Sequence, residues 1–162
     1  MAARYRIRPA GSADADALSG LERRCFSDPW SADAFRDVLD SAMCLGLVVS
    51  LGHEIIGYLL ARVVSGEGEI LNLAVVPDER RKGAGSALLE DGLAELVRRG
   101  AREVFLEVRE SNQAAQAMYQ RRGFRVVGAR QRYYRRPVED ALVLRLPLSA
   151  PRQTGPDDVD SG

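Results

Sequence analysis

The sequence has little of what usually cross-links a small protein. Only two of its 162 residues are cysteines, Cys25 and Cys44, and neither belongs to a C-x-x-C pair. Two cysteines are too few for a disulfide framework. We therefore expect free thiols, a cytoplasmic location and no structural metal, with stability supplied by an ordinary apolar core.

Long apolar runs and an excess of charge of one sign are also missing. No run approaches the roughly 18 apolar residues of a membrane span, and residues 1–14 lack the apolar centre of a signal peptide. The chain carries 23 basic and 23 acidic side chains. A general nucleic-acid binder usually shows a basic excess. Neither a membrane nor a nucleic acid is expected as a direct partner.

Histidine is nearly absent. The single histidine, His53, falls in a predicted hairpin turn, and both cysteines fall in apolar patterns where packing is the expected role. The sequence therefore offers no pairing of a nucleophile with a histidine base. A covalent enzyme intermediate is not expected.

The remaining pattern alternates between strands and helices, which predicts one α/β domain with a mixed sheet of six or seven strands. Strand-like runs cover residues 5–8, 44–50, 55–64, 69–76, 104–109, 124–134 and 141–146. Helical periodicity begins at Ser12, at the N-cap Ser31, after Gly85 and at Asn112. The third helix should turn Leu88, Leu89, Leu93, Leu96 and Val97 inwards. The domain is expected to span residues 1–149, with a disordered acidic tail at 150–162.

A glycine turn between a strand and the third helix gives the clearest chemical signal. Gly83 and Gly85 follow three consecutive cations, Arg80 to Lys82, at a helix N-terminus, where the helix dipole disfavours positive charge. A bound phosphate would remove that conflict. The P-loop pattern fails because no Lys-Ser or Lys-Thr follows the glycines. The dinucleotide pattern fails because Leu88 stands at its third glycine.

An acid and a phenol near the middle of the chain call for explanation. Glu107 lies between Leu106 and Val108 in a predicted strand, and Tyr119 lies two helical turns after Asn112 on the same helix face. Glu107 either pairs with an arginine such as Arg109 or Arg130, or serves as a catalytic base.

Two motifs resemble those of the GNAT acyltransferase superfamily. The segment L-A-V-x-P-x-x-R-x-x-G-x-G at residues 73–85 is similar to its motif A, and residues 112–124 match its N-x-x-A-x-x-x-Y-x-x-x-G-F pattern. Residues 25–31, 106–112 and 133–141 further resemble the ribosomal-protein-alanine N-acetyltransferases and related protein N-terminal acetyltransferases. The resemblance covers about residues 4–148.

The resemblance implies a GNAT fold with helices on both faces of the sheet and splayed central strands that form an acetyl-CoA cleft. Glu107 would be the general base, Tyr119 the general acid and Glu69 an alternative base. Acetyl-CoA would bind Leu73, Ala74, Val75, Arg80, Arg81, Lys82, Gly83, Ala84, Gly85, Ser86, Asn112 and Tyr119. The peptide would meet Phe26, Pro29, Trp30, Tyr133 and Tyr134, although core packing explains Phe26 and Trp30 nearly as well. If the strand continues through Tyr133 and Tyr134, alternation predicts that the two side chains face opposite ways.

The implied activity is transfer of acetyl from acetyl-CoA to a protein N-terminal α-amino group, most specifically the N-terminal alanine of a small-subunit ribosomal protein. The amine would attack directly in a ternary complex, and no metal is expected. Two alternatives stay open: acetylation of a lysine or a small-molecule amine, and a non-catalytic acyl-CoA-binding module. The presence of both Glu107 and Tyr119 argues against the second.

Overall fold

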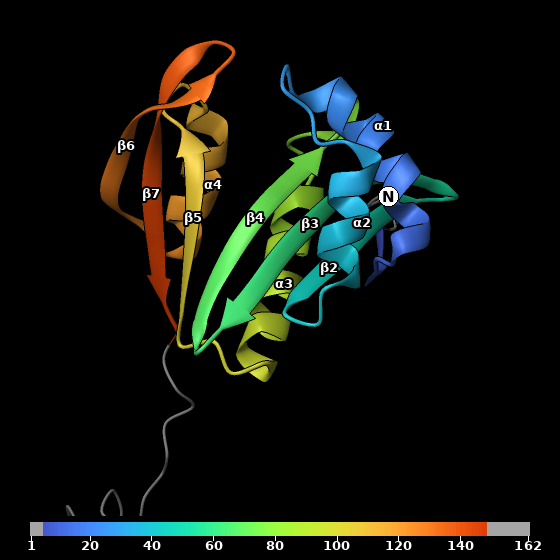
Figure 1. Cartoon of the computed structure of the whole chain (residues 1–162), viewed down its shortest axis with the longest axis horizontal. Helices are drawn as coiled ribbons and strands as arrows, with labels where there is room; N and C mark the ends of the chain where they lie inside the picture. Colours follow the sequence, from blue (N-terminus) through green and yellow to red (C-terminus); the bar gives the residue numbers. More distant parts are fainter. Residues whose placement is uncertain (1–4, 149–162) are drawn as a thin grey trace, which may run out of the picture.

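The computed structural model describes residues 5–148, which form a mixed sheet of seven strands in the order β1-β2-β3-β4-β5-β7-β6 (Figure 1). The strands are β1 (Tyr5–Pro9), β2 (Cys44–Leu51), β3 (Glu54–Val64), β4 (Glu67–Val75), β5 (Glu103–Arg109), β6 (Arg125–Arg135) and β7 (Val138–Pro147). The predicted acidic tail lies outside the described residues, so the domain boundary at residue 149 stays a prediction.

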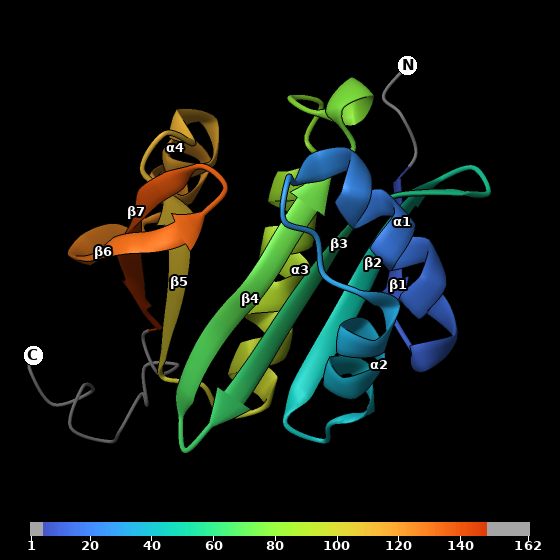
Figure 2. The same ribbon diagram turned by 45° about the horizontal axis from the view of Figure 1, so that its top comes forward.

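Helices cover both faces of the sheet, as predicted. In Figures 1 and 2, α1 (Ala15–Cys25) and α2 (Ala32–Asp40) lie on one face, and α3 (Ala84–Arg98) and α4 (Gln113–Arg122) lie on the other. Two short 3-10 helices, η1 (Ser12–Asp14) and η2 (Pro77–Glu79), precede α1 and α3. Within residues 5–148 no helix is both long and apolar enough to span a membrane.

Helix ends follow the local sequence closely. The Ser31 side chain accepts a hydrogen bond from the Ala34 amide at 3.1 Å, and Asn112 accepts one from the Ala115 amide at 3.1 Å. Gly100 and Gly123 adopt positive φ of 92° and 113° beyond α3 and α4, a conformation that glycine adopts without strain. The predicted helix starts at Ser31 and Asn112 are confirmed.

The prediction for Val97 is wrong. Leu89, Leu93 and Leu96 are buried along α3, whereas Val97 is 43% exposed. Val97 lies about 100° round the helix from Leu96, beyond the edge of the apolar stripe.

The central strands separate after a short paired region, as predicted. β4 and β5 pair in parallel from Glu67 with Glu103 to Ile70 with Leu106. β4 then continues to Val75 and β5 to Arg109 without further pairing to each other, and Figure 2 shows the two strands diverging. Leu71 is unpaired at a register shift against β3, and such a bulge bends the strand away from its neighbour.

Candidate active site

A cleft of about 600 Å³ opens where β4 and β5 separate. The segment between α1 and α2 forms the first wall of the cleft, the β6–β7 hairpin forms the second wall, and α4 closes one side. The predicted site residues that line this cleft are Phe26, Trp30, Glu69, Leu73, Glu107, Asn112, Tyr119, Tyr133 and Tyr134. Pro29 does not line it and is exposed.

The glycine turn ends in a helix N-terminus that no side chain caps. Gly83 is the N-cap of α3 with φ of 98°, and the first turn contains no acidic residue. The Ala87 amide bonds to the Gly83 carbonyl at 3.0 Å, so the amides before it in the helix have no helical partner. A Cβ on Gly83 would meet nothing within 4 Å. Free amides beside open space fit a pyrophosphate group.

The three cations of the turn have different surroundings. The Arg80 side chain donates from Nε to the Val75 carbonyl at 2.9 Å and thereby ties the turn to the end of β4. Lys82 Nζ lies 3.6 Å from the carboxylate of Glu79. Arg81 makes no ion pair with any residue from 5 to 148. The proposed conflict between cations and helix dipole therefore applies most directly to Arg81.

Glu107 faces the cleft and also pairs with an arginine. Its neighbours Leu106 and Val108 are buried in the core, so strand alternation turns the carboxylate to the open side. Arg130 Nε lies 2.8 Å from Glu107 Oε1, and a hydrogen bond with Glu107 is the largest cause of a raised pKa of Tyr133. The predicted arginine partner is therefore Arg130, and the carboxylate also lines the cleft, while its role as a base stays a prediction.

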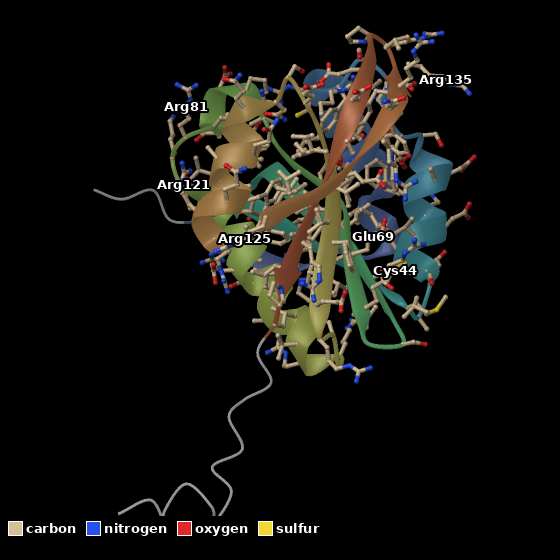
Figure 3. The ribbon with its side chains drawn as sticks, turned by 90° about the vertical axis from the view of Figure 1, so that its left-hand side faces the viewer. Cys44, Glu69, Arg81, Arg121, Arg125 and Arg135 are labelled. Carbon is tan, nitrogen blue, oxygen red and sulfur yellow. The ribbon has the colours of Figure 1, made fainter. Side chains whose placement is uncertain are left out.

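Glu69 lies where the strands are still paired. Arg62 Nη2 lies 2.7 Å from its carboxylate, and Glu69 is opposite Phe105 in the β4–β5 ladder, below the opening. In Figure 3 it lies on the other side of the central strands from Arg81, which belongs to the glycine turn. This position favours a role for Glu69 as an ion-pair partner of Arg62 at the edge of the cleft over a role as the catalytic base at its centre.

Tyr119 is buried but borders the cleft. Its ring packs against Phe124 at 5.6 Å between centroids, and its hydroxyl makes no hydrogen bond to residues 5–148. Burial raises the pKa of Tyr119 well above its ordinary value of 10. The phenol therefore keeps its proton at neutral pH and presents a donor to the cleft.

The opposite facing predicted for Tyr133 and Tyr134 is wrong, because both line the cleft. Arg132 has a positive φ of 52°, and the register against β7 shifts between Arg130 and Tyr134, so simple alternation fails here. The two rings meet edge to face at 5.1 Å. Arg109 lies 4.1 Å over the Tyr134 ring, and burial raises the pKa of Tyr134 to about 12.

The first wall combines packing with exposure to the cleft. Trp30 packs against Phe35 at 5.5 Å between ring centroids and also lines the cleft. The Ser27 hydroxyl donates to the Arg136 carbonyl of the β6–β7 hairpin and so joins the two walls. Both readings of Trp30, as a core residue and as part of the cleft wall, therefore hold.

One acidic group in the cleft was not predicted. Glu22 of α1 is 2% exposed and lines the cleft floor together with Asn72 of β4. Burial raises the pKa of Glu22 from 4.5 to about 7. Its sequence signal is an acid next to Leu21 and four residues after Leu18, within the apolar stripe of an amphipathic helix.

Parallel strands that separate beside an uncapped glycine turn, with an acid and a phenol between them, define an N-acyltransferase that uses acyl-coenzyme A. The chain belongs to the acetyltransferase (GNAT) family, whose model matches residues 15–124. It is accordingly an acetyl-CoA-dependent N-acetyltransferase, and the predicted family, fold and enzyme class are confirmed.

Three relatives show how close this membership is. The chain is 36% identical over 140 residues to the [ribosomal protein bS18]-alanine N-acetyltransferase of Escherichia coli K12, covering 84% of this chain and 93% of that one. It is 37% identical over 139 residues to the N-alpha-acetyltransferase RimI of Mycobacterium tuberculosis, covering 82% and 86%. The crystal structure of the ribosomal-protein-S18-alanine N-acetyltransferase from E. coli superposes with a TM-score of 0.85, at 32% identity and 94% and 99% coverage.

Two glycines at opposite ends of α3 provide a matched test of the anion site. Gly83 and Gly100 have φ of 98° and 92°, and a Cβ on either would meet nothing within 4 Å. Each alanine variant should therefore carry a similar backbone strain of about 1–2 kcal/mol. Only Gly83→Ala should weaken coenzyme A binding, by about tenfold or more, measured by isothermal titration calorimetry. Equal losses of affinity in both variants would refute the assignment of the turn.

Proposed function

We propose that this chain transfers acetyl from acetyl-CoA to the N-terminal α-amino group of a protein, with the N-terminal alanine of a small-subunit ribosomal protein as the substrate. The observation that supports it most is Glu107, an acid that faces the cleft at the separation of the strands, beside the two tyrosines of the second wall. The relatives named for bS18-alanine acetylation support the choice of acceptor. A cytoplasmic location stays a prediction.

The coenzyme is assigned to the edge of β4 and the glycine turn. Leu73 to Val75 would meet the pantetheine arm, and Arg81 to Ser86 the pyrophosphate. The Asn112 side-chain oxygen caps α4 by accepting from the Ala115 amide at 3.1 Å, which leaves its NH₂ group free to donate to the coenzyme. When bound, acetyl-CoA supplies an acetyl thioester whose carbonyl carbon accepts the amine.

The surroundings of Glu107 suit an α-amino group better than a lysine. A protein α-amino group has a pKa of about 7.7–8.0, against about 10.4 for lysine. Arg130 Nε lies 2.8 Å from Oε1 of Glu107, and a carboxylate is a modest base, which suits an amine of lower pKa better than one of higher pKa. Tyr133, hydrogen-bonded to Glu107, would orient it towards the amine.

Tyr119 is assigned to the other proton transfer. Because burial holds the pKa of its phenol high, the group stays protonated, and Tyr119 lines the cleft. It would donate this proton to the sulfur as the thiolate leaves. Glu107 from β5 and Tyr119 from α4 would thus serve the two ends of one transfer.

The choice of acceptor is tested with a peptide panel. The protein should acetylate a peptide with a free N-terminal alanine, and should leave unmodified the same peptide with a blocked N-terminus and an internal lysine. Mass spectrometry locates the added acetyl group. Acetylation confined to lysine would favour the lysine acetyltransferase alternative, and no transfer to any amine would favour a non-catalytic binding module.

The assigned acid and base are tested by conservative substitution. Glu107→Gln and Tyr119→Phe should each lower kcat on the order of 100-fold, because each removes one proton transfer while keeping the shape of the side chain. The dissociation constant of acetyl-CoA should stay nearly unchanged.

Glu103→Gln is the matched control, since Glu103 lies on the same strand and its carboxylate is 3.3 Å from Arg145 Nε, away from the cleft. It should keep the wild-type rate. Full activity of Glu107→Gln together with a large loss in Glu69→Gln would make Glu69 the base instead.

A further inference from the structure

The carboxylate of Glu22 is held by neutral hydrogen-bond donors from three other parts of the fold. Its Oε1 accepts from the Trp30 amide at 3.5 Å and from Asn72 Nδ2 at 3.1 Å. Its Oε2 accepts from the Tyr58 hydroxyl, and Asn72 Nδ2 also donates to the Tyr58 oxygen at 2.8 Å. One side chain of α1 therefore contacts β3, β4 and the segment between α1 and α2.

No cation compensates this buried acid within residues 5–148. The titratable neighbours are Cys25 on α1, a thiol whose pKa is raised by its own burial, and Tyr58 on β3. On β4 the facing group is the neutral Asn72, and Glu69 is engaged by Arg62. Burying a charge without a partner of opposite sign is costly.

Ionised Glu22 consequently works against stability. The pKa of this carboxyl rises from 4.5 to about 7 on folding. Protonated Glu22 therefore contributes stability that is fully present below pH 4.5 and is lost as the pH rises to about 7. At neutral pH and above, a neutral side chain of the same shape would give a more stable fold. An acid kept at such a cost indicates a role in function.

The position of Glu22 suggests that role. Trp30 belongs to the first wall of the cleft, and Asn72 directly precedes the residues assigned to the pantetheine arm. The carboxylate is thus a direct link between the wall that would meet the peptide and the strand that would hold the coenzyme. A charged carboxylate accepts hydrogen bonds about twice as strongly as a neutral amide oxygen does.

We propose that Glu22 is a positioning residue for the peptide substrate: its charged carboxylate holds the wall at residues 26–30 against β4, in the position that the peptide requires. The inference rests on the proposed function, since it assigns that wall to the peptide. It predicts an effect on the KM for peptide, without a change in coenzyme affinity.

The variant Glu22→Gln tests the charge while it keeps the shape. The ratio of the variant's peptide KM to that of the wild type should be close to one at pH 6, where both side chains are neutral. It should rise to about tenfold at pH 8, where only the wild type is charged. Taking the ratio cancels the titration of the peptide amine. A ratio that does not change with pH overturns the proposal, because a purely structural role would give that result.

The only tryptophan of the chain, Trp30, provides a second readout that needs no activity. Its fluorescence in the wild type should titrate with a midpoint near pH 7, and the titration should be absent in Glu22→Gln. His53→Gln is the control for the single histidine, which lies in the turn between β2 and β3, and should keep the titration. The proposal that Glu22 positions the wall is refuted if the titration is lost in His53→Gln or persists in Glu22→Gln.

The two readouts separate this proposal from the proposed function. If the wild type acetylates no peptide but Trp30 titrates through Glu22, the acceptor assignment fails and the coupling of Glu22 to the wall stands. If peptides are acetylated and neither readout depends on Glu22, only the present inference fails. Thermal unfolding checks that Glu22→Gln folds: its Tm should match that of the wild type near pH 4.5 and exceed it by several degrees above pH 7.

Discussion

Pairing between β4 and β5 ends after Ile70 and Leu106, and the active site depends on that ending. Below this point the strands belong to one continuous sheet, and above it each presents an unpaired backbone edge. The bulge at Leu71 bends β4 away from β5 at this level. Unpaired backbone groups in a protein interior need partners. The assigned pantetheine arm offers such partners, so the coenzyme would complete the sheet.

The charges of the cleft are arranged in two different ways. Glu107 has a guanidinium partner, Arg130, and is partly open to solvent. Glu22 has only neutral donors and is buried, which brings its pKa close to neutrality. One carboxylate is therefore ion-paired with Arg130 beside the assigned amine site, whereas the other has only neutral donors and a pKa of about 7. The two acids suit different tasks: proton removal at Glu107 and control of the peptide wall at Glu22.

Sequence reasoning succeeded where the determinants are local and failed where they are distant. Ser31 and Asn112 cap helices through amides only three residues away, so both boundaries were predictable. The direction in which Tyr133 and Tyr134 point depends on Arg132, which adopts the left-handed backbone conformation. Arginine has no preference for that conformation, so the sequence does not predict it. Glu22 was missed because its partners Tyr58 and Asn72 lie 36 and 50 positions away. For Glu107 the sequence predicts either Arg109 or Arg130 as the ion-pair partner. Only the packing of β6 against β7 places Arg130 beside it.

Hydrogen–deuterium exchange with and without acetyl-CoA tests the dependence on strand separation most directly. Amides of residues 71–75 that point towards β5 should exchange rapidly in the free protein and slow down when acetyl-CoA is added, together with those of the turn at residues 81–86. Amides of Glu67 to Ile70, which lie in the paired region, should not respond. Slow exchange at residues 71–75 before the coenzyme is added, or protection confined to other strands, would contradict this account.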